Sequence, residues 1–470
     1  MQGKKQHTEK LFNSFKISDR VPRQNLYRIL KEKLDLKFLY PATTTYYGKE
    51  GQASIDPVVF FKLILVGYLE NLNSDRKIID HAQMRLDIIY FIGYDIDEEL
   101  PWHSTLSRTR QLYGQEIFLQ LFKQVLKLCI DKGMVSGRRQ AVDSAYIKAN
   151  ASLDSLVEKE VMDDAQTYSD ELMANDEDAL KKKTISYLRK KKVEQHHAWK
   201  EKEYQQQHKL SQSTKERTDK RRPKFLSNHT HYSNTDADAR ISVKPGKPRQ
   251  LNYTAQTVVD TSHHVITHIM ADYSDKRDSQ SLEQVINQTK ENLAENGLLL
   301  EEVLADTGYS SGSALAYLDQ QNIAGYIPNF GQYKPSREGF IYNKELDRYE
   351  CIQEGGHKAM LPYKSTNMGS LDYEKKSYRS SSKDCKHCPL RKTCIGKTAD
   401  YKKIEDSIHK HYYDKMHQRL QTSYAKGMKK LRSSTVEPVL GTLINFTGMR
   451  RIYTRGIKQA NKFMLCAAIA

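Results

Sequence analysis

The sequence predicts an α/β protein, in which a mixed sheet flanked by helices follows an N-terminal α-helical domain and is interrupted by two insertions. Three observations favour this class. Apolar residues recur at the spacing of one helical face through the first 135 residues. From Arg138 onward, alternating strand patterns take turns with helical ones. Two polar stretches, each too long for a simple connection, interrupt these patterns.

The charge balance indicates a polyanionic partner. The 470 residues contain 75 Lys and Arg against 58 Asp and Glu, a formal net charge of +17. Each phosphate that Lys or Arg neutralises releases counterions, so nucleic acid is favoured over a merely solvated surface and over a membrane. No window has the length of a signal-peptide core or a membrane span. Six Cys in so long a chain indicate a reducing cytoplasm and not a disulfide scaffold.

Helix signals organise the first part of the chain, which we expect to begin with a loosely ordered lead-in over residues 1–50. Asp56 followed by Pro57 predicts a helix start, because Asp caps free amides and proline fits the first helical position. The apolar run that follows predicts a core helix. A second helical run spans residues 75–93, and a third spans 101–133.

Hydrogen-bond donors gather near the start of the third run, which we expect to be capped by Ser104 or Thr105. A helix N-terminus with basic side chains is a usual place to hold phosphates, although an ordinary cap with a solvated basic face explains the pattern equally well. The candidate DNA-binding residues here are His103, Arg108 and Arg110.

The first strand pattern contains an acid. An apolar pair precedes Asp143, and alternating residues continue to Lys148, which is able to contact phosphate. Charged residues and Gln then dominate residues 152–235, which we interpret as a charged helical insertion, because such a segment buries little apolar surface. Its basic run at 181–192 is interpreted as a solvated helix face in preference to a DNA contact.

Strand patterns resume at Leu251 with a hairpin that turns at 261–264, followed by a helix over 279–296. A short apolar strand then ends on Asp306, and a helix and a further strand-like segment follow. The hairpin contains His263, His264 and His268. Because no Cys or paired carboxylate stands at ligand spacing, we interpret them as turn and strand residues and not as a metal site.

This order of elements is the layout of an RNase H-like core, with acids on the first and fourth strands. In that fold the two strands are neighbours, so Asp143 and Asp306 are expected to share a metal site. A third carboxylate is available at Glu437, which follows a cap-like SST sequence and precedes Pro438. Two Asp and one Glu suit two divalent ions that activate water and stabilise a leaving oxygen.

Three stretches together resemble the DDE transposases of bacterial insertion sequences, in particular the IS1182 family of the IS4/IS5-like group: VDSAYIKANAS, VLADTGYSSG and LRSSTVEPVLGTLINFTGMRR. The resemblance covers essentially the whole chain. It implies that Asp143, Asp306 and Glu437 are catalytic and bind two Mg²⁺ (or Mn²⁺) ions. The implied activity is cleavage at the ends of the insertion sequence and joining to target DNA, by a homodimer or higher oligomer in the bacterial cytoplasm, associated with the nucleoid. The alternative is a catalytically inactive, transposase-derived DNA-binding protein.

The stretch around Glu437 departs from the family signature. Arg432 stands five positions before the acid instead of four, the nearest preceding Tyr is Tyr424, and Ile444 occupies the usual Lys position. The candidate DNA contacts in this region are Arg432, Arg450, Arg451 and Arg455. The chain ends inside an apolar helical run where relatives usually continue, as expected of a clipped terminus.

A cysteine cluster lies between the second and third acids. Cys385 and Cys388 form a CxxC pair, with Cys394 after it and Cys351 upstream. Four thiolates fit a closed tetrahedral Zn²⁺ site, which is favoured over free thiols, with His387 competing with Cys351 as the fourth ligand. We expect this zinc to stabilise an insertion that has few apolar residues. Cys129 and Cys466 lie in apolar helices and are predicted core residues.

The predicted domains follow from these signals. They are an N-terminal helical DNA-binding domain (1–135), a catalytic core (136–151, 236–340 and 425–470), the charged insertion (152–235) and a Cys-containing insertion (341–424).

Overall fold

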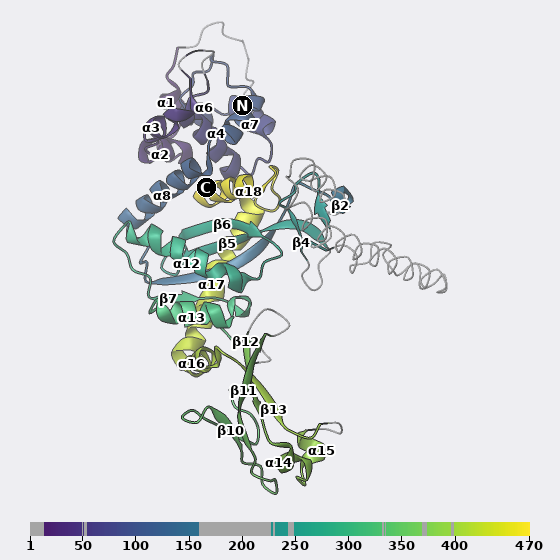
Figure 1. Ribbon diagram of the computed structural model, residues 1–470. Helices are drawn as coiled ribbons and strands as arrows, with labels where there is room; N and C mark the ends of the chain where they lie inside the picture. The colour runs from purple at the N-terminus through teal and green to yellow at the C-terminus, as the bar shows by residue number, and fades with distance from the viewer. Residues whose placement is uncertain are drawn as a thin grey trace, which may run out of the picture.

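The structure is a computed structural model that describes residues 14–48, 50, 54–158, 227–228, 231–242, 249–330, 333, 335–368, 374–395 and 399–470. Figure 1 shows an elongated arrangement, with helices at one end, a mixed sheet in the middle and a second sheet at the other end. Most of the predicted charged insertion, including its basic run at 181–192, lies outside the described residues.

The first part of the chain is helical. Asp56 caps the predicted core helix, its carboxylate accepting hydrogen bonds from the amides of Val58 and Val59. That helix, α4, buries Phe60, Leu63 and other apolar side chains on most of its circumference, as a helix that is apolar all round should. The elements are α1 (Ile17–Arg20), α2 (Leu26–Lys33), α3 (Leu39–Thr43), η1 (Thr44–Tyr46), α4 (Pro57–Leu69), α5 (Asp75–Gln83), α6 (Leu86–Ile92), α7 (His103–Leu112) and α8 (Gln115–Asp131).

Two expectations for this region need correction. The lead-in is not loosely ordered where it is described, because Tyr27 on α2 and Leu39 on α3 are buried in the core. Each of the two later helical runs is broken into two helices, the first by Arg85, whose backbone is extended, and the second before Gly114. Periodicity did not reveal the breaks because apolar side chains on both halves of each run face the same core.

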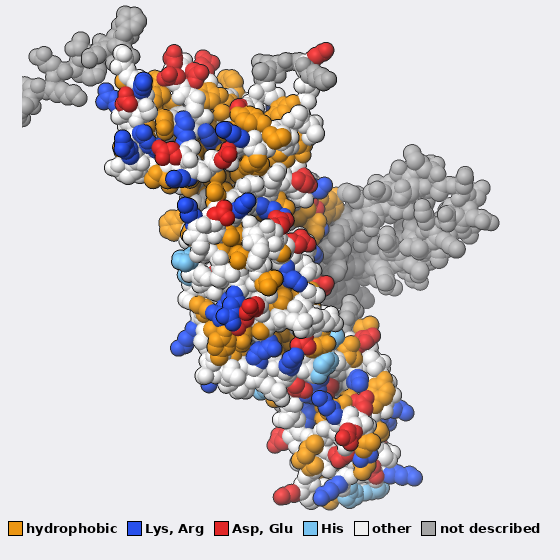
Figure 2. Space-filling model, turned by 90° about the vertical axis from the view of Figure 1, so that its left-hand side faces the viewer, with side chains coloured by type: hydrophobic (Ala, Val, Ile, Leu, Met, Phe, Trp, Pro, Cys, Tyr) orange, Lys and Arg blue, Asp and Glu red, His pale blue; other side chains and the backbone are white. Residues whose placement is uncertain are grey.

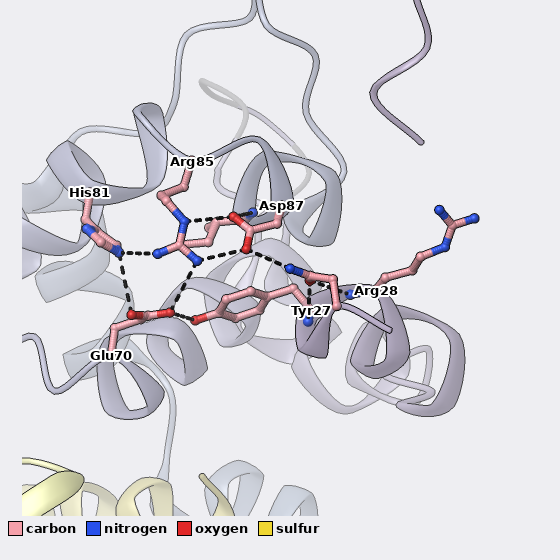
Figure 3. Close-up of polar contacts among 8 residues, drawn as sticks. Tyr27, Arg28, Glu70, His81, Arg85 and Asp87 are labelled. Carbon is pink, nitrogen blue, oxygen red and sulfur yellow. Dashed lines mark hydrogen bonds and ion pairs between the residues drawn. The ribbon is translucent and has the colours of Figure 1, made fainter. Parts of the chain in front are cut away.

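A polar network links four of these helical segments (Figure 3). The Arg85 guanidinium donates two hydrogen bonds to Asp87, at 2.9 and 2.8 Å, and lies 3.7 Å from Glu70. The Tyr27 hydroxyl donates to Glu70 at 2.6 Å, and the His81 ring lies 3.7 Å from the same carboxylate. Because α2, the end of α4, α5 and α6 each contribute a residue, the network fixes their relative orientation where the chain turns at Arg85.

The central sheet is mixed. β5 pairs antiparallel with both β1 and β6, whereas β1 pairs parallel with β7, which pairs parallel with β8. The strand order is β4-β5-β1-β7-β8, and β6 also pairs with β5. The first and fourth strands of the predicted core, β1 and β7, are therefore neighbours, as expected. The strands are β1 (Arg139–Lys148), β4 (Arg240–Ser242), β5 (Gln250–Asp260), β6 (Ile266–Tyr273), β7 (Glu302–Leu304) and β8 (Ala324–Tyr326).

Helices cover both faces of this sheet. On one face, Val142, Val258 and Val303 pack in a core with α12, α13 and α16. On the other face, residues such as Ala255 and Leu304 pack with α17 and α18 in a core that continues into the N-terminal helices. The flanking helices are α12 (Asp278–Ala294), α13 (Gly312–Gln320), α16 (Lys410–Leu420), α17 (Ser423–Phe446) and α18 (Ile457–Ile469).

The C-terminal helix α18 joins the helical region to the sheet (Figure 1). Lys462 is only 4% exposed, and its ammonium donates to the carbonyl of Arg110 at 3.0 Å and to that of Tyr113 at the end of α7. Asn461 accepts a hydrogen bond from the Ala271 amide of β6 at 3.0 Å. The apolar end of the chain, including Cys466, is therefore an internal junction. Cys129, by contrast, is half-buried beside the same core.

A second, antiparallel sheet contains the cysteine region. It has its own small core, formed by Phe340, Leu361, Ile404 and two buried tyrosines, Tyr349 and Tyr378. The region was expected to have few apolar residues, and its core is indeed small, with tyrosine rings as two of its five buried members. Its elements are β9 (Phe340–Asn343), β10 (Arg348–Cys351), β11 (Met360–Met368), β12 (Glu374–Arg379), α14 (Ser382–Lys386), α15 (Arg391–Cys394) and β13 (Lys403–Ser407).

Two short elements complete the description: η2 (Leu153–Ser155) leads into β2 (Leu156–Glu158), which pairs with β3 (His231–Ser233). Within the described ranges, no helix is both long enough and apolar enough to cross a membrane.

Buried His268 predicts acid sensitivity. Its ring nitrogens have no hydrogen-bond partner among the described residues, and burial lowers its pKa from 6.5 to about 4. The native state therefore favours the neutral ring, so stability is fully present above pH 6.5 and falls as the pH drops toward 4, by about 3 kcal/mol. We expect His268→Leu to flatten this part of the pH profile of the thermal midpoint. His264→Asn, in the exposed turn, should leave the profile unchanged, and an equal effect of both variants would contradict the assignment.

Lys462 predicts the strength of the α18 junction. Lys462→Met should lower the free energy of unfolding by about 2–3 kcal/mol, because two carbonyls at the end of α7 would lose their buried donor. Urea unfolding of the full chain measures the change. Lys458→Met, on the exposed side of the same helix, is the matched control and should have little effect. Equal stability of the two variants would show that the buried ammonium is dispensable.

Candidate active site

The parallel pairing of β1 with β7 brings two acids to one place. Ala141 pairs with Leu304 in this ladder. Asp143 lies two residues after Ala141, and Asp306 lies two residues after Leu304. Because side chains alternate across a strand, Asp143 shares the sheet face of Ala141, which is the face covered by α17. Asp306 follows the end of β7, where its carboxylate accepts a hydrogen bond from the Gly308 amide at 2.9 Å.

The third predicted acid lies on α17. Glu437 was expected near a helix start, but it lies in the interior of a helix that begins at Ser423. The hydroxyls of Ser433 and Ser434 donate to carbonyls one turn back instead of capping a helix. Pro438 follows Glu437 inside the helix. A proline here has no amide to donate, so the backbone hydrogen bond of that turn is missing beside the acid.

Arg432 connects two of the acids. Its guanidinium donates to the Asp143 carboxylate at 2.9 Å and to the Glu437 carboxylate at 2.8 Å. The Arg432 and Asp143 side chains are 15% and 18% exposed, whereas that of Glu437 is 55% exposed. The structure therefore brings the three predicted acids into one region, with a buried arginine between the first and the third.

The electrostatics of Asp143 reflect this setting. Burial raises its pKa above the ordinary value, and the nearby Asp306 carboxylate adds to the increase. The Ser144 amide, which donates to Asp143 at 2.8 Å, and the Arg432 guanidinium oppose it. A carboxylate that is partly buried beside another carboxylate needs a cation to remain charged.

A further acid, Asp278, was not predicted from the sequence. It is the first residue of α12, and its carboxylate accepts a hydrogen bond from the Gln256 amide at 3.1 Å. Asp278 Oδ2 and Asp306 Oδ1 each lie 3.0 Å from the point that a β-carbon on Gly308 would occupy. Burial, and then the charges of Asp278, Asp143 and Asp306, raise the pKa of Tyr309, whose hydroxyl donates to Gln256. In the sequence, an acid at a helix start signals only a favourable helix terminus.

Comparison with known families matches two parts of the chain. Residues 15–112 match a transposase domain (DUF772), and residues 356–470 match a transposase DDE domain. Two separate parts of the chain are thus similar to transposase domains, and the second is similar to a DDE domain. The two matches are consistent with the IS1182-type arrangement. Glu437 and Arg432 lie inside the second match, whereas Asp143 and Asp306 lie outside both. No curated protein among those compared matches the chain.

Three of the predicted DNA-binding residues lie beside the end of β1. Lys148 forms a parallel bridge with Arg451, so the segment after α17 runs along the strand end. Arg451 also donates to the Asn150 side chain at 3.2 Å, and Arg450 donates to Asn445 at 2.8 Å. Lys148, Arg450 and Arg455 are exposed. Lys148, Arg450 and Arg451 are far apart in the sequence but lie together at the end of β1. We call these three residues and the exposed Arg455 that follows them the β1-end surface.

The basic residues of α7 have different surroundings from one another. The helix begins after Trp102, which is 75% exposed, and not after Ser104 or Thr105 as expected. Arg108 is exposed, and the His103 ring contacts the Arg76 guanidinium at 3.4 Å. The Arg110 guanidinium forms a two-point ion pair with Asp75, at 2.9 and 2.6 Å, so both of its terminal nitrogens already bind a carboxylate. A DNA contact of Arg110 stays a prediction. The partners of Arg432 are likewise acids, and its DNA contact also stays a prediction.

The surface charge of the protein is mixed. Figure 2 shows Lys and Arg side chains interspersed with acidic and apolar ones on the face that it presents, without one continuous basic patch. The net charge therefore gives no DNA path by itself on this face, and smaller basic surfaces must be argued from their contacts.

The cysteines of the second sheet are close to one another. Burial raises the pKa of Cys394, with Cys351 and Cys385 adding to the increase, and Cys385 contacts the Ser380 hydroxyl at 3.0 Å. Among the described residues, however, no group of three or more His, Cys, Asp or Glu side chains is arranged to hold a metal ion. The zinc site formed by Cys351, Cys385, Cys388 and Cys394 therefore stays a prediction.

A substitution at Gly308 tests how closely the Asp278 and Asp306 carboxylates must approach each other. In Gly308→Ala the new methyl group would press on both Asp278 and Asp306, so we expect divalent-ion-dependent DNA cleavage to fall about tenfold or more, a barrier increase of roughly 1.4 kcal/mol. A gel assay with end-bearing DNA measures cleavage, and thermal unfolding checks the fold. Gly427→Ala, on an exposed part of α17 with open space around it, is the control and should retain activity. Full activity of Gly308→Ala would show that the two carboxylates need not approach each other.

Proposed function

We propose that the protein is an active transposase that cleaves the ends of its insertion sequence and joins them to target DNA by phosphoryl transfer. In this proposal the central sheet is an RNase H-like core, and Asp143, Asp306 and Glu437 are its catalytic acids. The observation that carries the proposal is the approach of two acids through the β1–β7 ladder, with Glu437 tied to the first of them by Arg432.

The donor set of the site fits divalent cations such as Mg²⁺ or Mn²⁺. Hard cations prefer carboxylate oxygens, and Asp143, Asp306 and Glu437 supply three such groups, with Asp278 beside the second. Two bound ions would supply the charge that activates the attacking oxygen and stabilises the leaving one. The chain's own part is to orient these carboxylates. It does so through the Gly308 and Ser144 amides, which donate to Asp306 and Asp143.

The proposed substrate is double-stranded DNA, at both the transposon ends and the target. The β1-end surface is suited to phosphates of the duplex, because it brings together Lys and Arg side chains of which three are exposed. Arg108 and His103 on α7 are candidates for contacts further along the duplex. We propose that a homodimer or higher oligomer acts on DNA in the cytoplasm, because two ends must be cut and joined together.

The alternative, a transposase-derived protein that binds DNA without cleaving it, is less well supported. Such a protein would have no need for three carboxylates in one region or for a buried arginine that neutralises two of them. A protein that bound DNA but gave no metal-dependent nicking would favour this alternative.

The proposed roles predict the behaviour of isosteric variants. Asp143→Asn, Asp306→Asn and Glu437→Gln should each lower Mg²⁺-dependent cleavage of end-bearing DNA by at least about a thousandfold, because each loses a charged ligand. DNA affinity, measured by gel shift, should change little. Asp275→Asn, an exposed acid outside the site, is the control. Retained cleavage in the Asp306→Asn variant would contradict the assignment of Asp306 as a catalytic acid.

A further inference from the structure

Arg432 occupies an unusual position for a residue expected to contact DNA. Its side chain is 15% exposed and is therefore more buried than the two acids that it binds. Glu437 on α17 is 55% exposed, and Asp143 on β1 is 18% exposed. Each of two guanidinium nitrogens binds one carboxylate, at 2.9 and 2.8 Å. A guanidinium forms a planar fork of donors, so it is able to bridge two acids that belong to different elements.

The bridge places a positive charge among the acids that are proposed to hold cations. Asp143 is partly buried and feels the charge of Asp306, and Arg432 is the cation that counters both effects. The oxygens that Arg432 binds are Asp143 Oδ2 and Glu437 Oε1. A divalent ion bound by these two carboxylates would compete for the same oxygens.

Resting on the proposed function, we propose that Arg432 is a positioning residue that acts as an exchangeable counter-ion for the metal site. Before cations bind, Arg432 draws Glu437 toward Asp143 and neutralises both. When cations bind, the guanidinium releases the carboxylates and becomes available to a DNA phosphate. Metal binding and the presentation of this arginine are therefore linked, and its charge sets the metal affinity of the free protein.

The local backbone favours such an exchange. Glu437 is on the exposed side of α17, and Pro438 removes a backbone hydrogen bond from the adjoining turn. Arg432 lies more than one helical turn before Glu437, so its long side chain is able to turn away while α17 stays packed through buried Val436 and Leu440. Only side chains need to move, and the sheet that fixes Asp143 and Asp306 does not.

The test is a titration of the full chain with Mn²⁺ in the absence of DNA, in which isothermal titration calorimetry measures the binding affinity. Arg432→Gln should bind Mn²⁺ about tenfold more tightly than the unmodified protein, because the competing charge is gone. A factor of about ten corresponds to one unit in the logarithm of the binding constant. Arg432→Lys keeps the charge but lacks the fork, so its affinity should fall between the two. Lys426→Gln, which removes an exposed charge from the same helix, is the control and should change affinity far less.

A second readout is the thermal midpoint. Without metal, Arg432→Gln should unfold at a lower temperature, since Asp143 and Glu437 lose their counter-ion, and added Mn²⁺ should raise its midpoint by more than that of the unmodified protein. Equal or weaker Mn²⁺ binding in Arg432→Gln would overturn the counter-ion role while leaving the proposed function intact. If that variant does not fold, Arg432→Lys decides, and an affinity equal to the unmodified protein overturns the role. Absence of Mn²⁺ binding in every protein, including the unmodified one, would overturn both proposals.

Discussion

The parallel ladder between β1 and β7 is the constraint on which the candidate site depends. Asp143 and Asp306 are far apart in the sequence, and only the register that pairs Ala141 with Leu304 puts them at equal distances along adjacent strands. A shift of one residue would turn one of the acids to the opposite face of the sheet. The apolar residues on both faces hold the register, because Val142 and Val303 belong to one core and Ala141 and Leu304 to the other.

The same ladder creates an electrostatic difficulty that α17 resolves. The carboxylates of Asp143 and Asp306 repel each other, and burial in the protein further disfavours the charged form of Asp143. Glu437 brings more negative charge from α17, but the helix also carries Arg432, which binds both Asp143 and Glu437. The pairing thus offsets the repulsion among the acids, and it occupies one oxygen of Asp143 and one of Glu437.

The sequence was informative where a local signal had a local consequence. Asp56 before Pro57 marked the start of α4, and the alternating pattern marked the β5–β6 hairpin. It was uninformative where tertiary contacts decided the outcome. Nothing near Arg110 in the sequence shows that Asp75 binds it, and the Ser residues before Glu437 look like a cap because a cap and an i−3 hydrogen bond use the same hydroxyls. Asp278 was missed because its neighbour Gly308 is close only in space.

The C-terminal helix extends the argument from the site to the molecule. α18 contacts α8 and α4 on one side and β6 on the other, and the segment just before it forms part of the β1-end surface. Lys462 satisfies carbonyls at the end of α7, the helix that carries His103 and Arg108. The two candidate DNA-contacting regions are therefore connected through one short stretch of chain, from Arg450 to Lys462. Buried hydrogen bonds and apolar packing along that stretch therefore join the helical region that carries His103 and Arg108 to the sheet that carries the acids.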